Sequence, residues 1–78
     1  MIEREKKSIK SRVKEVRDKS NALTNSSANI PVDVLDMIDQ LEADVTEEIV
    51  KGVIDGRQLL RIADKRAIEI EKILRNYE

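Results

Sequence analysis

Apolar residues in the C-terminal part of the chain recur with the period of a coiled coil. Between residues 46 and 77 they are separated alternately by four and three positions, which places them along one side of a helix. We name this set the heptad seam, and its members are Ile49, Val53, Gly56, Leu60, Ala63, Ala67, Ile70, Leu74 and Tyr77. The spacing predicts a long helix over residues 45–77 that packs along the seam.

Further aliphatic residues lie beside the seam on the same predicted helix. They are Val50, Ile54, Leu59, Ile62, Ile68 and Ile73. We name them the flanking aliphatics. With them the apolar arc is wider than a two-stranded coiled coil needs, so the pattern predicts at least two neighbouring helices.

A thinner apolar stripe runs along residues 2–24. Ser20 occupies one position of its repeat, and the apolar members are Ile2, Ile9, Val13, Val16 and Leu23. A helix with so few apolar residues is not stable alone, so we expect it to dock on another helix.

Residues 25–30 separate this stripe from the rest of the chain. The Asn and Ser side chains in this stretch compete for backbone hydrogen bonds in non-helical conformations, and Pro31 disfavours a helical conformation at Ile30. Proline suits the first turn of a helix, so the next helix is expected to begin at residue 31. A loop of this length allows the chain to reverse, which predicts an antiparallel hairpin.

The apolar stripe changes phase near Asp44. After the loop it continues at Val34, Ile38, Leu41 and Val45. The next apolar residue, Ile49, follows Val45 after four residues, whereas the alternation of fours and threes requires a step of three. The extra residue corresponds to ~100° of helix rotation. Asp44 and Glu47 also have the spacing of a capping box. These signals predict a helix over residues 31–43 and a break or kink before residue 45, with one continuous helix as the alternative.

The two alternatives differ in what covers the apolar surface. A break makes a compact three-helix unit, whereas a continuous helix leaves apolar surface for a second chain. Asp55 and Gly56 offer another place for one helix to end and the next to begin. If the helix is instead continuous here, Gly52 and Gly56 each lower its stability by about 1 kcal/mol relative to alanine. Glycines at such a cost indicate that another backbone approaches closely.

The composition excludes several classes of function. With 78 residues the chain is interpreted as one helical domain, residues 1–78. It contains no Cys and no His, which excludes disulfides, thiolate zinc sites and His-assisted nucleophiles. Its one aromatic residue, Tyr77, argues against an aromatic ligand pocket. We expect no cofactor, no metal ion and no small-molecule ligand.

The hydropathy pattern gives no sign of a membrane protein. The longest stretch without a charge, residues 20–32, is mostly polar and shorter than the ~20 apolar residues of a spanning helix. The charged residues 3–7 do not fit a secretory signal. We therefore expect a cytoplasmic location and no membrane partner.

Charge is nearly balanced over the whole chain, with a net charge of −1, but it is unevenly distributed. Residues 1–20 contain eight basic and four acidic residues, residues 29–56 contain one basic and eight acidic residues, and residues 57–78 contain six basic and four acidic residues. The ends are therefore positive and the middle is negative.

Basic residues in the first segment recur every three or four positions. We name this set the basic ridge, and it comprises Arg4, Lys7, Lys10, Lys14 and Arg17. A ridge of this kind neutralises phosphates, which indicates nucleic-acid binding. Alternatively the basic helix lies against the acidic middle of the chain or of a second copy. We favour the second interpretation, because the chain as a whole is slightly acidic.

An acidic run at Asp33, Asp36 and Asp39 has a spacing of three with apolar residues between. A calcium loop needs oxygen ligands at alternate positions and a central glycine. General acid–base catalysis needs buried carboxylates with separated pKa values. We therefore interpret the run as the solvated side of a helix and expect no enzymatic activity.

These patterns together predict an all-α protein, a helix-loop-helix hairpin with a long or kinked second arm that self-associates, most simply as a dimer. They favour a non-enzymatic protein–protein interaction module, such as an adaptor, assembly, chaperone-like or inhibitory factor, that acts through the heptad seam. The alternative is a nucleic-acid-associated regulator that uses the basic ridge.

Overall fold

Three α-helices make up most of the chain in the computed structural model, which describes residues 2–78. They are α1 (Glu3–Asn25), α2 (Val32–Lys51) and α3 (Gly56–Leu74), and α3 continues into a 3₁₀ turn, η1 (Arg75–Tyr77). The predicted all-α class is confirmed, since residues 2–78 contain no β-strand.

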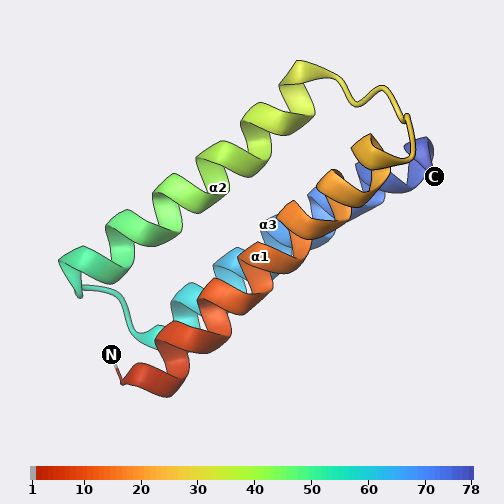
Figure 1. Cartoon of the computed structure of the whole chain (residues 1–78). Coiled ribbons are helices and arrows are strands. Elements are labelled where there is room, and N and C mark those ends of the chain that lie inside the picture. Colours follow the sequence, from red (N-terminus) through yellow and green to blue (C-terminus); the bar gives the residue numbers. More distant parts are fainter. Residues whose placement is uncertain (1) are drawn as a thin grey trace.

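The helices form a bundle in which α1 and α3 run in the same direction and α2 runs against both (Figure 1). The beginnings of α1 and α3 lie near each other, and their ends also lie near each other (Figure 1). Each short connection reverses the direction of the chain, which gives this up-down-up order. The predicted long second arm is therefore two helices that fold back on each other.

The first connection ends α1 without a glycine. Ser27 has a positive φ of 70°, and the Ala28 N–H donates a hydrogen bond of 2.9 Å to the Leu23 carbonyl. Pro31 then precedes α2 as its N-cap residue. The loop lies within a residue or two of the stretch expected from the Asn, Ser and Pro residues there.

The second connection lies at residues 52–55, so the predicted break at Asp44 is wrong, and so is the alternative of one continuous helix. Gly52 has a φ of 65°, and its N–H donates a 3.0 Å hydrogen bond to the Glu48 carbonyl, which ends α2. The Asp55 carboxylate accepts a 2.9 Å hydrogen bond from the Arg57 N–H and begins α3.

The helix continues through Asp44 for a simple geometric reason. A step of four residues rotates a side chain by only ~40° around an α-helix, so the step from Val45 to Ile49 keeps both residues on the inner side of α2. Val45 is buried and Ile49 is half-buried. The apparent change of phase is thus tolerated without a break, whereas Gly52 and Asp55 supply real caps.

The core is aliphatic and draws on all three helices. Ser20 is buried among its members, which are Ile9, Val13, Val16, Ile30, Val34, Ile38, Leu41, Val45, Leu59, Ala63, Ala67, Ile70 and Leu74. Of the stripe expected on the first helix, Ile2 is exposed and Leu23 is half-buried. The thin stripe of α1 is therefore stabilised by docking on α2 and α3.

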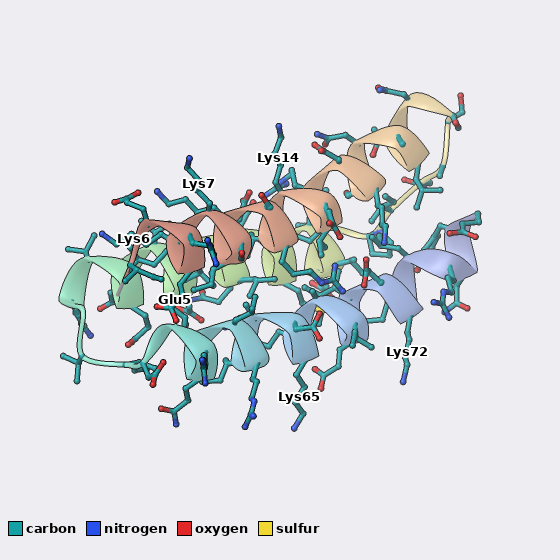
Figure 2. All side chains as sticks on the ribbon, turned by 90° about the horizontal axis from the view of Figure 1, so that it is seen from below. Glu5, Lys6, Lys7, Lys14, Lys65 and Lys72 are labelled. Carbon is teal, nitrogen blue, oxygen red and sulfur yellow. The ribbon has the colours of Figure 1, made fainter. Side chains whose placement is uncertain are left out.

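Gly56 allows the beginnings of α1 and α3 to come close together. A Cβ at this position would lie 2.5 Å from Oε1 and 3.0 Å from Cβ of Glu5. Glu5 lies on α1, on the side toward the other two helices (Figure 2). The close approach expected at Gly56 is thus made by a side chain of the same chain.

Candidate functional site

The heptad seam does not form one exposed surface. Val53 is 82% exposed and lies in the connection between α2 and α3. The half-buried members are Ile49, Leu60 and Tyr77, and the buried members are Gly56, Ala63, Ala67, Ile70 and Leu74. The prediction of a single helical seam is wrong, because the heptad count crosses the caps at Gly52 and Asp55. From Gly56 onward the seam is largely the inner side of α3.

Charged side chains close the edge of α3 that faces α1. Arg12 donates two hydrogen bonds to the Glu71 carboxylate, with N–O distances of 2.6 and 3.1 Å, and one of 2.7 Å to Asp64. Lys19 also pairs with Glu71. We name Arg12, Lys19, Asp64 and Glu71 the α1–α3 ionic network. It joins residues up to 59 positions apart in the sequence.

The carboxylate of Glu71 remains charged although its side chain is only 12% exposed. The hydrogen bonds from Arg12, followed by the one from Lys19, lower the pKa of Glu71 to about 2, against the opposing effect of burial. Hydrogen bonds to Glu71 and Asp64 raise the pKa of Arg12. Groups that hold their charge this firmly do not exchange protons near neutral pH, so the network joins two helices and does not suit acid–base catalysis.

The opposite edge of α3, toward α2, is hollowed between the two helices. A groove of about 230 Å³ lies there, and its aliphatic lining consists of Leu41, Val45, Ile54, Leu59 and Ile62. We name it the α2–α3 groove. Leu41, Val45 and Leu59 belong to the core, whereas Ile62 is 43% exposed. The groove therefore exposes to solvent aliphatic surface that is continuous with the core.

Acidic residues dominate the border of this groove, which is formed by Asp44, Glu47, Glu48 and Arg66. Arg66 donates a 2.8 Å hydrogen bond to Asp44, and together with Gln40 it lowers the pKa of that carboxyl. Glu47 pairs with Lys51 at 3.0 Å. Glu48 forms no ion pair within residues 2–78. The border thus carries net negative charge, concentrated on the α2 side.

The basic ridge is only partly engaged by the acidic middle of the chain. Arg17 pairs with Asp39 and Glu42 of α2. The other ridge residues are exposed and form no ion pair within residues 2–78, and they are Arg4, Lys7, Lys10 and Lys14. The interpretation that the ridge lies against the acidic segment therefore holds for Arg17 alone.

The exposed lysines lie on two sides of the bundle. Lys7 and Lys14 project from α1 on one side, and Lys65 and Lys72 project from α3 on the opposite side (Figure 2). These four lysines therefore do not form one continuous surface.

The part of the chain described, residues 2–78, offers no group of three or more His, Cys, Asp or Glu side chains placed to hold a metal ion. In the acidic run, Asp39 pairs with Arg17, while Asp33 and Asp36 are exposed. Within the same residues, none of the helices has the length and apolar character needed to cross a membrane.

Compared with protein families, curated proteins and solved structures, this chain matches none. The chemistry of the groove and of the two charged surfaces is therefore what points to function. The groove combines a concave shape with an exposed aliphatic side chain, Ile62. A second hollow, of about 360 Å³, lies on the α1–α3 edge, and its lining includes Leu23 and Leu74 together with the charged Lys19 and Glu71.

Reasoning from the sequence missed this groove as a site, although it named some of its residues. Ile54, Leu59 and Ile62 were recognised as flanking aliphatics, and their excess over the needs of a simple coil was the available signal. Which of them are covered depends on the position of α2. Arg12 and Glu71 gave no sequence signal, because their pairing depends on the parallel packing of α1 and α3.

Proposed function

We propose that this protein is a non-enzymatic interaction module that binds a protein partner through the α2–α3 groove. The observation that supports the proposal is the groove itself, an aliphatic depression with Ile62 at its exposed side and charged residues around it. Apolar surface surrounded by polar residues is typical of protein-binding sites.

This proposal places the interaction surface beside the heptad seam. The seam residues Ala63, Ala67 and Ile70 are covered by the chain's own helices. We predict a dimer from the sequence because one chain would leave this seam uncovered, and that reason therefore does not apply to these residues. Self-association stays a prediction, to be tested through the exposed aliphatic residues.

A matched pair of variants on α3 tests the proposal. Ile62 is 43% exposed and lines the groove, whereas Ile68 is 42% exposed and lies outside it. We expect Ile62→Asp to lose the proteins that co-purify with the wild type from its native cell, and Ile68→Asp to keep them. Helical circular dichroism and thermal melting of both variants establish that the fold is retained.

The same experiment also examines self-association. Light scattering at tens of micromolar gives the mass of each variant, and a dimer that Ile62→Asp dissociates would identify a second copy as the partner. If the co-purifying proteins are the same for the wild type and both variants, the groove is not the interaction surface.

Nucleic-acid binding through α1 is the second candidate function. The observation in its favour is that Arg4, Lys7, Lys10 and Lys14 are exposed and outside any ion pair within residues 2–78. Phosphate contacts by such residues give an affinity that falls steeply with salt. We rank this function second, because these cations lie on a single helix and the whole chain has a net charge of −1.

Charge reversal on opposite sides of the bundle separates the two functions. The double variant Lys7→Glu/Lys14→Glu and its control Lys65→Glu/Lys72→Glu change the net charge equally (Figure 2). We expect the wild type to bind mixed duplex DNA or RNA no tighter than about 10 μM at 150 mM salt. Submicromolar binding that is lost only in the α1 variant would make the basic ridge the functional surface.

A further inference from the structure

We propose that the partner segment held in the α2–α3 groove is an amphipathic helix that carries aliphatic residues on one side and lysine or arginine beside them. The inference rests on the proposed function and specifies the chemistry of the partner. Two properties of the groove lead to it, namely the shape of its aliphatic lining and the sign of the charge around it.

The aliphatic lining matches the apolar side of a short helix. Its α2 wall runs from Leu41 to Glu48, which is ~10 Å of helix and about two turns. Residues i, i+4 and i+7 of a partner helix span the same length along one side. A volume of about 230 Å³ exceeds the ~150 Å³ of an engineered cavity that holds benzene, so the groove has room for one or two aliphatic side chains.

The charge around the groove favours a basic partner. Of the four charged lining residues, Arg66 is paired with Asp44 and Glu47 is paired with Lys51. The fourth, Glu48, has no ion-pair partner within residues 2–78. All other ionisable residues of α2 except Lys51 are acidic. A cationic side chain that borders the aliphatic contact therefore meets complementary charge, and an acidic one meets repulsion.

A second copy of this chain fits the groove less well. On α1 the unpaired cations are exposed, but Ile9, Val13 and Val16 beside them are buried. On α3, Ile68 is exposed and has basic neighbours, but it is six residues from Ile62 and so ~120° away around the helix. Such a contact is head-to-tail and continues into open chains instead of closing as a dimer. We therefore assign the groove to a different protein.

Three designed peptides with the same helical length test the inference. The first carries Leu at i, i+4 and i+7 with flanking Lys, the second replaces the Lys with Glu, and the third is a scrambled version of the first. Fluorescence anisotropy of labelled peptide against the wild-type protein measures each dissociation constant. We expect the Lys peptide to bind about tenfold more tightly than the Glu peptide, with the difference shrinking at high salt. The scrambled peptide should not bind.

Variants of the protein locate the contact. Glu48→Lys should weaken binding of the Lys peptide and strengthen binding of the Glu peptide. Its control is Asp36→Lys, which makes the same change of charge on an exposed residue of α2, ~18 Å away along the helix. We expect Asp36→Lys to leave both affinities within about twofold of the wild type. Ile62→Asp should remove binding of the Lys peptide, and Ile68→Asp should not.

The outcomes distinguish a wrong partner chemistry from a wrong surface. Equal binding of the Lys and Glu peptides, lost in Ile62→Asp, would keep the groove as the site and overturn the basic partner. Binding of neither peptide, while Ile62→Asp still loses the native partners, would likewise overturn the helix assignment and leave the proposed function intact. Peptide binding that is unaffected by Ile62→Asp would also overturn the inference, and so would a self-association of the protein that Ile62→Asp abolishes.

Discussion

The two edges of α3 meet their neighbouring helices in different ways. Toward α1, the edge is closed by the α1–α3 ionic network of Arg12, Lys19, Asp64 and Glu71. The Glu71 side chain at its centre is only 12% exposed. Toward α2, the ion pair between Arg66 and Asp44 lies beside an aliphatic groove. On the first edge, Arg12 and Glu71 satisfy each other with little exposure, while the second edge exposes the aliphatic side chain of Ile62 beside core residues.

The two edges therefore differ in what they contribute to the free protein and to binding. Ionic hydrogen bonds with little exposure hold a defined geometry, because removing one partner leaves the other charge unsatisfied. Aliphatic surface left open does not stabilise the free chain, but it contributes to binding once a partner covers it. Under the proposed function, the α1–α3 edge is structural and the α2–α3 edge is the one that binds the partner.

The largest expected effect comes from core residues of α3, and it tests how that helix is oriented between its neighbours. Leu59 is buried and Leu60 is half-buried, so Leu59→Ala should lower the free energy of unfolding by about 2–5 kcal/mol and Leu60→Ala by about 1 kcal/mol. Urea unfolding measures both values. Lys65 is exposed, so Lys65→Ala is the control and should change the free energy of unfolding by under about 0.5 kcal/mol. A larger effect at Leu60 than at Leu59 would mean that α3 is rotated from the orientation described.

Breaking the ionic network should have the next largest effect. Glu71→Gln keeps the shape of the side chain but leaves Arg12 and Lys19 without their shared carboxylate. We expect the free energy of unfolding to fall by about 1–3 kcal/mol, between the values for exposed and buried ion pairs. Asp44→Asn breaks the exposed pair on the other edge and should cost less. Equal losses in the two variants, measured by urea unfolding, would remove the contrast between the edges.

Acid should weaken the α1–α3 edge in a defined range of pH. The pKa of Glu71 is about 2 in the folded protein and 4.5 ordinarily, so the unfolded state binds the proton first as the pH falls. The stabilisation from this carboxylate is complete above pH 4.5 and is lost as the pH falls from 4.5 through about 2. Thermal melts of the wild type and Glu71→Gln across this range should converge toward low pH. A difference between them that stays constant would show that Glu71 is not held in its charged form.

The smallest expected effect is a gain in stability at Ser20, a core position of α1. The Ser20 side chain is buried, and its Oγ has no hydrogen-bond partner among the described residues. Ser20→Ala removes the unsatisfied hydroxyl and introduces the best helix former, so we expect a gain of up to about 1 kcal/mol. The melting temperature measures the change, with Ser11→Ala on the exposed side of α1 as the control for helix propensity. A lower melting temperature in Ser20→Ala, but not in Ser11→Ala, would mean that the Ser20 hydroxyl has a hydrogen-bond partner in solution.

The local features of this protein can be derived from its amino-acid sequence. The loop around Pro31 followed from residues that disfavour helix, and the stripes of α1 and α2 followed from a period of 3.6. A helix boundary at Asp55 and Gly56 was an alternative in the sequence, but the C-cap at Gly52 was not predicted, because the heptad spacing continues across both positions. A periodic count carries no information about backbone conformation, whereas a glycine in the left-handed region and an Asp N-cap act directly on the backbone.

The exposure of the aliphatic residues depends on how the three helices pack, and the sequence pattern does not show it. Leu59, Ile62 and Ile68 were equivalent in the sequence as flanking aliphatics, yet Leu59 is core, Ile62 borders the groove and Ile68 lies on another side. Their exposure depends on where α1 and α2 cross α3, which is fixed by the sum of many contacts between residues far apart in the chain. The pairing of Arg12 with Glu71, 59 positions away, arises from the same packing and has no periodic signal of its own.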